Sequence, residues 1–531
     1  MTLGHVATRC GALHNSGGNS RQLMSRSMHQ ARGDIHSLQL IFARWYLTAG
    51  NEVSTAGDTL LTAAIEYPVG QFTQVKWDGS TTGEFVCQTL ASDFTPIYIP
   101  DGETFYVRSF QSASASLVWT LSRDEENGEA CTFGPSGVAD QTMGGTIQSI
   151  PGFEIYRPLA VIAATDRPSV AIIEDSRGYG VGDVLDSAGD KGNAQRSLSP
   201  YVAFTNLSRS GDQAAKFVAN HDHRLVAANH CSDIFLHLGI NDNSVGRTEE
   251  QIIADLETIV GYFPGKRVWL GTIEPKTTST DGWVSISGQT VDSANAVRIA
   301  VNNAIRAGLK GASGYFDIAD VLERGRNSGV WRVYGGQPLT DDGLHSNRLG
   351  YQVVEDSGVI DPRVFFPGVN LVASPEKAAK GQSSRYLTAQ SLGNRPRFKA
   401  TKDGIDQTGV APDASVKVTF PVTSMNVGRY YDEAASLWVP PPGVYRIRGQ
   451  VSFVGGIQDQ MQYILRLRKN GIDEATWYHR TSGPYGFSIA VETIVEANGA
   501  EGFEICVKCS GAGDKTIGGN IGYTFFEGAP V

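Results

Sequence analysis

Five short apolar runs lie in the middle of the chain, separated by segments with helical periodicity. The runs span 169–173, 201–206, 233–238, 267–273 and 315–318. Continuous apolar runs of four to eight residues are typical of strands that are buried on both faces, as in a parallel sheet. The pattern therefore predicts a central domain with a parallel sheet.

Two of the intervening segments have clear helix signals. Segment 248–263 begins with Thr248 and has Gln251 three residues later, which is a capping-box start. Its Ile252, Ile253, Leu256 and Val260 share one helical face. A second helix is predicted over about 292–309. Helices between parallel strands give an α/β/α domain, which we place at 161–368.

The segments on both sides have a different pattern. Within 38–160, short strand-like runs such as TFYVRSF and SLVWTLSR are separated by Gly, Asp and Ser, which predicts a β-sandwich. Its aromatic residues could form the core or a sugar-stacking surface, and core is the more common role: Trp45, Tyr46, Trp77 and Trp119. Residues 1–37 are rich in Ser, Gly, Arg and His, which predicts an N-terminal arm or attachment segment.

The composition changes again after Pro367. Residues 369–397 are polar and lack a sustained apolar period, so we predict a linker there. Residues 398–531 contain alternating runs, and Asn470-Gly471 between two of them predicts a hairpin turn. This last segment is expected to form a second all-β domain. The predicted fold class is therefore multidomain, α/β plus all-β.

Four polar blocks follow the central runs in order. They are EDSRG with Ser176, NLSRSGD with Gly211, LGIND with Asn241, and DDGLH with Asp342 and His345. The first three lie just after predicted strands, and open parallel sheets bind ligands beyond the carboxyl ends of their strands. A hydroxyl, an imidazole, a carboxylate and amide donors are the groups that acyl transfer through a serine nucleophile requires.

These blocks resemble those of the SGNH, or GDSL-like, hydrolases over about 166–361. The resemblance implies that Ser176 is the nucleophile, His345 the base and Asp342 the group that orients the imidazole. It implies an oxyanion hole made by the backbone N–H groups of Ser176 and Gly211 and by the Asn241 side chain. Two neighbouring carboxylates are assigned supporting roles: Asp175 and Asp242.

One position departs from this family. Glu174 stands two residues before Ser176, where the family usually has glycine. A carboxylate beside a forming oxyanion would oppose catalysis unless it points away, so Glu174 puts the rate in question. We expect a salt bridge from Glu174 to Arg177 or Arg209.

Charge and composition exclude several other classes. A net charge of −10 and a pI near 5.5 argue against nucleic acid or an anionic membrane as the main partner. No apolar run has the length of a membrane span, and MTLGHVATRC lacks the features of a secretory signal. Neither the histidines of NHDHR nor the Cys506–Cys509 pair has partners for a metal site, so no metal or cofactor is expected.

The C-terminal segment resembles the jelly rolls of tumour necrosis factors and complement heads. The residues that carry this resemblance include VTFPV, PPPGVYR, RKNG and the closing FFEG. The resemblance implies a homotrimer.

The order of the domains resembles that of bacteriophage tail fibres and tail spikes. It implies a virion protein, attached to other tail proteins, that acts outside the cell on capsule or lipopolysaccharide. The expected activity is removal of O-acetyl groups from such a polysaccharide. Two alternatives remain: a catalytically impaired fibre that only binds glycan, and a cellular lipase or thioesterase.

Overall fold

The computed structural model describes residues 2–334, 336–366, 397–427, 431–440, 443–481, 486–497, 500–520 and 524–530. The chain divides into two compact units. The first holds Met1–Thr280, Gln289–Trp331 and Leu339–Pro367, and the second holds Asp281–Gly288, Arg332–Pro338 and Gly368–Val531. The linker predicted at 369–397 lies outside the described residues, except for Arg397.

A six-stranded sheet forms the centre of the first unit. Its strand order is β2-β19-β18-β20-β21-β24, and every neighbouring pair is parallel. The strands are β2 (Cys10–Gly11), β18 (Ser169–Glu174), β19 (Ala203–Asn206), β20 (Asp233–His237), β21 (Arg267–Gly271) and β24 (Gly314–Phe316). All six residues of β18 are buried, as the continuous apolar run predicted.

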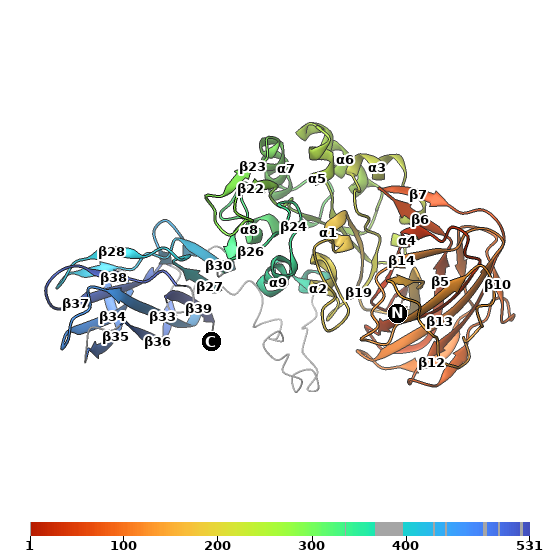
Figure 1. The fold of residues 1–531 in the computed structure, drawn as a ribbon, viewed down its shortest axis with the longest axis horizontal. Helices are drawn as coiled ribbons and strands as arrows, with labels where there is room; N and C mark the ends of the chain where they lie inside the picture. Colours follow the sequence, from red (N-terminus) through yellow and green to blue (C-terminus); the bar gives the residue numbers. More distant parts are fainter. Residues whose placement is uncertain are drawn as a thin grey trace. The chain divides into compact units, whose positions relative to one another are not determined.

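The helices of the first unit lie between these strands in the chain or after the last of them. They are α1 (Ser176–Tyr179), α2 (Asn193–Leu198), α3 (Ala214–Ala219), α4 (Asp222–Ala228), α5 (Ile240–Ser244), α6 (Glu249–Gly261), α7 (Asn295–Ala307), α8 (Ile318–Leu322), α9 (Arg348–Ser357) and the 3-10 helix η1 (Pro362–Phe365). Helix α6 contacts α3 and α7, whereas α9 contacts α2 and α8. Figure 1 shows α3, α6 and α7 at the top of this region and α2 and α9 lower down. The capping box predicted at Thr248 and Gln251 is confirmed.

The N-terminal β region contains two larger sheets, ordered β1-β17-β5-β11, with β12 on β5, and β10-β8-β13-β4-β15, with β9 on β8. Their strands are β1 (Thr2–His5), β4 (Gln22–Gln30), β5 (Ile35–Ala43), β8 (Thr59–Glu66), β9 (Phe72–Gln74), β10 (Gly83–Glu84), β11 (Thr89–Ala91), β12 (Thr95–Ile99), β13 (Thr104–Ala113), β15 (Ala130–Gly134) and β17 (Ala160–Thr165). A small sheet joins β3 (Asn15–Ser16), β14 (Val118–Leu121) and β16 (Glu154–Ile155), and a hairpin joins β6 (Trp45–Thr48) to β7 (Asn51–Ser54). Trp45, Trp77 and Trp119 are buried in this core.

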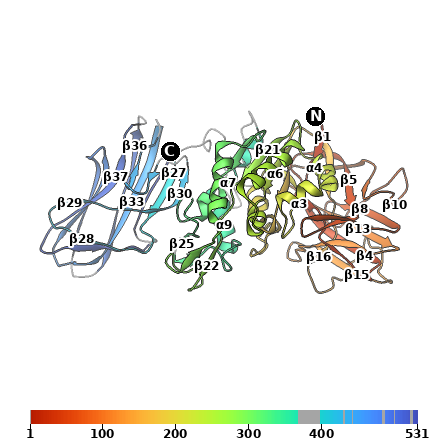
Figure 2. The same cartoon turned by 90° about the horizontal axis from the view of Figure 1, so that it is seen from above.

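The predicted N-terminal arm is wrong. Strand β4 pairs with both β13 and β15, and β1 pairs with β17. Strand β2 is the edge strand of the parallel sheet. The prediction rested on the small number of large apolar residues, but this segment buries small and polar side chains that form hydrogen bonds. Ser25 Oγ, for example, donates to Tyr156 O at 2.8 Å. The N-terminal residues thus tie the β region and the α/β region into one unit, and Figure 2 shows β1 and α4 in that unit.

The second unit contains two antiparallel sheets in 397–530. One is ordered β28-β38-β33-β39-β27-β30 with β36 on β33, and the other β31-β32-β37-β34-β35 with β29 on β37. The strands are β27 (Arg397–Thr401), β28 (Gln407–Val410), β29 (Ser415–Lys417), β30 (Val422–Val427), β31 (Tyr431–Asp432), β32 (Leu437–Trp438), β33 (Gly443–Gly455), β34 (Gln462–Lys469), β35 (Ile472–Arg480), β36 (Phe487–Ala497), β37 (Phe503–Cys509), β38 (Lys515–Ile517) and β39 (Phe525–Pro530). The hairpin predicted at Asn470-Gly471 is confirmed, since both residues have positive φ, at 51° and 79°, between β34 and β35.

Two short hairpins complete the described elements. One joins β22 (Thr277–Ser279) to β23 (Gln289–Val291), and the other joins β25 (Val333–Tyr334) to β26 (Gln337–Pro338). No helix among the described residues is long and apolar enough to cross a membrane.

Candidate active site

Ser176, His345 and Asp342 lie in hydrogen-bond contact. The Ser176 hydroxyl is 2.8 Å from His345 Nε2, and His345 Nδ1 is 2.6 Å from Asp342 Oδ2. Ser176 is the first residue of α1 and is separated from the end of β18 only by Asp175, and His345 lies three residues before α9. The sheet and its last loop thus bring together a hydroxyl and an imidazole that are 169 positions apart in the sequence.

A tight turn holds the Asp342 carboxylate against the imidazole. Asp342 Oδ1 accepts the backbone N–H groups of Leu344 and His345, both at 2.8 Å. Partial burial opposes ionisation, but the hydrogen bonds from His345 and from these two N–H groups hold the pKa of Asp342 well below its usual range. Asp342 therefore stays an acceptor, which keeps the imidazole proton on Nδ1 and leaves Nε2 to accept from Ser176.

Helix α1 positions the Ser176 hydroxyl. Asp175 is its N-cap residue, and its carboxylate accepts the Arg177 N–H at 3.0 Å. Gly178 in the same turn has no room for a side chain, because a Cβ there would lie 2.4 Å from Glu174 Cβ. The predicted supporting role of Asp175 is therefore that of a helix cap beside the nucleophile.

The predicted oxyanion donors lie on the loops after β19 and β20. Gly211 has φ of +80°, a conformation that favours glycine. The Asn241 amide donates one N–H to Asp212 O at 2.8 Å, which leaves its second N–H for another acceptor. Among the backbone hydrogen bonds that join described loops and elements, neither Ser176 nor Gly211 donates its N–H.

Asp242 holds the Gly211 loop from the other side. Its buried carboxylate accepts the N–H groups of Ala214 and Ala215 at the start of α3, at 2.8 and 3.1 Å. The side chains of Asn241 and Asp242 therefore fix the two ends of the short segment from Asp212 to Ala215.

The partner predicted for Glu174 is wrong. Its carboxylate is fully buried and lies 2.8 Å from His237 Nδ1 on β20, and among the described residues it forms no ion pair with Arg177 or Arg209. The neighbouring position on the parallel strand decides this pairing, because Glu174 and His237 are directly opposite each other in the sheet. Burial raises the pKa of Glu174, since only one of its oxygens has a hydrogen-bond partner among the described residues.

His237 continues into a chain of buried ionic groups that the sequence did not indicate. His237 Nε2 is 3.2 Å from Glu274 Oε2, and that oxygen is 2.9 Å from Arg177 Nε. Burial alone would lower the pKa of His237, but Glu274 and Glu174 raise it to about 10. Burial would raise the pKa of Glu274, but Arg177 and His237 lower it to about 2.

Arg177 connects this ionic chain to the histidine loop. Its Nη2 donates to Leu344 O, next to His345, at 3.0 Å. The guanidinium is buried and follows Ser176 directly in α1. Arg177 thus joins the segment that carries the nucleophile to the segment that carries the imidazole. The motif EDSRG by itself did not indicate this role of Arg177, because its partners Glu274 and Leu344 lie far away in the sequence.

The N-terminal hairpin β6–β7 supports the opposite side of the site. Glu52 on β7 accepts the N–H groups of His223 and Arg224 at 2.8 and 2.7 Å. The fully buried Arg224 forms an ion pair with Asp212, whose carbonyl accepts from Asn241. Burial raises the pKa of Asp212 to about 6, although Arg224 opposes this. Three successive contacts, through Arg224 and Asp212, therefore connect Glu52 of the β region to Asn241.

The histidines of NHDHR pack on aromatic rings. His221 stacks on Tyr262 with ring centroids 4.2 Å apart, and His223 stacks on Trp45 at 5.3 Å. Among the described residues, no group of three or more His, Cys, Asp or Glu side chains is suited to a metal ion.

Comparison with family models and with curated proteins finds no match. Among solved structures, a lipolytic protein of the G-D-S-L family from Veillonella parvula DSM 2008 is 19% identical, covers 38% of this chain and 99% of its own, and has a TM-score of 0.28. The native aryl esterase of M. smegmatis is 16% identical, with 38% and 100% coverage and a TM-score of 0.26.

A third solved structure matches a shorter part of the chain. The globular domain of zebrafish complement 1qA protein is 14% identical, covers 26% of this chain and 98% of its own, and has a TM-score of 0.20. None of the three exceeds 19% identity, so these similarities assign no activity to the chain.

Proposed function

We propose that this protein is a serine esterase. The observation that carries the proposal is the continuous hydrogen-bonded series Ser176 Oγ, His345 and Asp342, at 2.8 and 2.6 Å, in the loops beyond a parallel sheet. A hydroxyl alone is a weak nucleophile at neutral pH, and an adjacent oriented imidazole activates it. The proposed reaction is hydrolysis of a carboxylic ester.

In the first step, Ser176 Oγ attacks the ester carbonyl carbon while His345 Nε2 takes the hydroxyl proton. The negative charge that develops on the carbonyl oxygen is stabilised by the N–H groups of Ser176 and Gly211 and by the Asn241 amide. His345 then gives its proton to the departing alcohol, and an acyl-serine remains. Water, deprotonated by His345, attacks the acyl-serine and releases the carboxylic acid and the free hydroxyl of Ser176.

The ester that we propose as substrate is an O-acetyl group on a bacterial surface polysaccharide. The test is acetate release from purified host polysaccharide, measured with an enzyme-coupled acetate assay. Wild-type protein is expected to release acetate, and Ser176→Ala is expected to release none above background. No acetate from the polysaccharide, together with hydrolysis of p-nitrophenyl acetate, would refute the substrate and retain the esterase.

The two alternatives give different results in the same assays. A fibre that only binds glycan retains the polysaccharide on the protein and hydrolyses neither substrate. Glu174 is the sequence feature that favours this alternative, and its pairing with His237 beneath Gly178 of α1 supports the esterase instead. A lipase or thioesterase would prefer long acyl chains in a series of p-nitrophenyl esters from acetate to palmitate.

We also propose that the protein is a homotrimer in a phage tail, in contact with other virion proteins. Large apolar side chains on the strands of the second unit are exposed, which is consistent with burial against further copies: Val444, Val454, Ile472, Trp477, Tyr478 and Ile494. Sedimentation equilibrium of the full chain is expected to give three times the monomer mass. A monomer at micromolar concentration would refute the trimer.

A further inference from the structure

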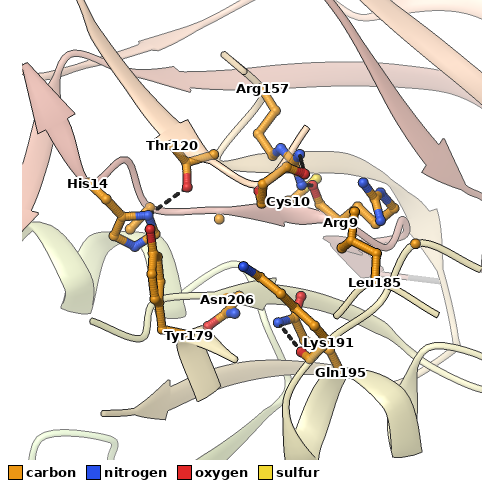
Figure 3. A pocket seen from close by; sticks show the side chains of 14 residues that line it. Arg9, Cys10, His14, Thr120, Arg157, Tyr179, Leu185, Lys191, Gln195 and Asn206 are labelled. Carbon is orange, nitrogen blue, oxygen red and sulfur yellow. Dashed lines mark hydrogen bonds between the residues drawn. The ribbon is translucent and has the colours of Figure 1, made fainter. Parts of the chain in front are cut away.

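A pocket lies beside helix α1, within the first unit (Figure 3). It has a volume of about 40 Å³, and none of Ser176, His345 or Asp342 lines it. Tyr179, the last residue of α1, forms one wall. Residues three apart on a helix are about 5–6 Å apart at Cβ, so the pocket begins about one helical turn from Ser176.

The charged residues that line this pocket are all cationic. They are Arg9, Arg157 and Lys191, and no Asp or Glu is among the lining residues. Glu129 does not line the pocket, and Arg9 and Arg157 share its carboxylate, at 3.0 and 3.3 Å. Asp124 and Asp190 also lie near Arg9. These carboxylates therefore offset the charge of Arg9 and part of that of Arg157, whereas the Lys191 ammonium has no ion pair among the described residues.

The Lys191 side chain extends into the middle of the pocket in Figure 3. Its ammonium is 5.1 Å from the centre of the Tyr179 ring. The Lys191 ammonium forms no hydrogen bond or ion pair in the part of the chain that the structure describes. The side-chain amides of Gln195 and Asn206, which also line the pocket, donate to Gly178 O. Burial lowers the pKa of Lys191, Asp183 opposes this, and Arg157 and Arg9 lower it further.

A partly buried ammonium without an acceptor is unfavourable unless an anion or water compensates it. The pocket volume of about 40 Å³ holds a group of a few non-hydrogen atoms, since one water needs about 10–15 Å³ of such space. A carboxylate has this size and the right charge. A whole sugar ring is too large for it.

We propose that this pocket binds the carboxylate of an acidic sugar unit, so that the polysaccharide substrate is anionic and the acetylated unit is held at Ser176. This inference rests on the proposed function. It assigns Lys191 as the direct ligand of the carboxylate, with Tyr179 as the wall between the two sites. The protein would then prefer acetylated polymers that contain uronic or other acidic sugars.

The kinetic test compares two substrates that differ only in the carboxylate. One is an O-acetylated uronic-acid oligosaccharide, and the other is the same oligosaccharide after reduction of its carboxyl groups to alcohols. Wild-type KM is expected to be at least ten-fold lower for the acidic substrate. In Lys191→Met the ratio of the two KM values is expected to fall to about one, and Lys191→Arg is expected to restore most of it.

Lys310→Met is the matched control, because it removes the charge of an exposed lysine that lies in the same unit and far from Lys191 in the sequence. It is expected to keep the wild-type KM ratio. Equal KM values for both substrates in wild type, or the same change of the ratio in Lys310→Met as in Lys191→Met, would refute the pocket. No acetate release from either substrate would instead refute the proposed O-acetyl polysaccharide substrate, and p-nitrophenyl acetate hydrolysis would then show whether the esterase itself is retained.

A binding measurement separates the pocket from catalysis. Glucuronate, glucose and inorganic phosphate are titrated into Ser176→Ala protein, with and without Lys191→Met, by isothermal calorimetry. Glucuronate alone is expected to bind, and only when Lys191 is present. Binding of phosphate as tight as that of glucuronate, or binding that survives Lys191→Met, would overturn the assignment of a carboxylate to Lys191.

Discussion

Asn241→Ala tests the oxyanion hole directly. The Asn241 amide has two N–H groups, one of which donates to Asp212 O at 2.8 Å. The other N–H is the only side-chain donor assigned to the oxyanion. Loss of one such donor typically costs about 2.7–4 kcal/mol of transition-state stabilisation, which is about 10²–10³-fold in kcat. The KM of p-nitrophenyl acetate is expected to stay within about three-fold, since the oxyanion exists only in the transition state.

The substitution also removes a structural hydrogen bond, and its effect must be separated from catalysis. A hydrogen bond of this kind contributes about 0.5–1.5 kcal/mol to the free energy of unfolding. Asn243→Ala is the matched control, because Asn243 lies on the same helix α5 and donates its amide to Ala294 O at 3.3 Å. It is expected to lower stability by a similar amount and to change kcat less than three-fold.

The assay is steady-state hydrolysis of p-nitrophenyl acetate, with thermal unfolding followed by circular dichroism. The assignment of Asn241 to the oxyanion hole is refuted if Asn241→Ala keeps more than about a fifth of the wild-type kcat. It also fails if Asn241→Ala and Asn243→Ala lose the same activity, because a loss of fold and not of a donor would then explain both.

Three substitutions and one pH dependence test the groups that hold the site. Asp342→Asn is expected to lower kcat by about 10³–10⁴-fold without unfolding, since an amide favours the wrong imidazole tautomer; activity near wild type would exclude Asp342 from the triad. Arg177→Lys is expected to lower kcat by about 10²-fold, because lysine cannot bind Glu274 and Leu344 O together. The control is Arg123→Lys, at a buried arginine of the β region. An equal loss of kcat in this control would refute the role of Arg177. Glu52→Ala is expected to lower kcat more than Glu52→Gln, because an amide oxygen still accepts the α4 N–H groups; the reverse order would contradict the hairpin's role. The pKa of His237 is raised from 6.5 to about 10 in the folded protein, so its contribution to stability is complete below pH 6.5 and is lost as the pH rises through 10. Calorimetry should show an unfolding midpoint that falls as the pH rises over this interval. The same fall of the midpoint with pH in His237→Gln would refute the role of His237.

The sequence determined the elements whose signals are local. The capping box at Thr248 and Gln251 and the turn at Asn470-Gly471 depend on residues a few positions apart, and both are present as predicted. Strand β18 is buried throughout because its apolar run leaves no polar side for solvent. The first three polar blocks likewise indicated which loops carry Ser176, Gly211 and Asn241, since parallel strands deliver their ends to one edge of a sheet.

The tertiary structure decided everything that depends on pairing across long sequence separations. The partner of Glu174 is His237, because the register of β18 and β20 sets them opposite each other, and no pattern within EDSRG reveals that register. Residues 1–37 form strands because other strands supply partners for their polar groups, a condition that composition does not record. Buried ions such as Arg177 and Arg224 are stable only when distant chain segments provide carboxylates and carbonyls, so their roles appear only when those segments meet in space.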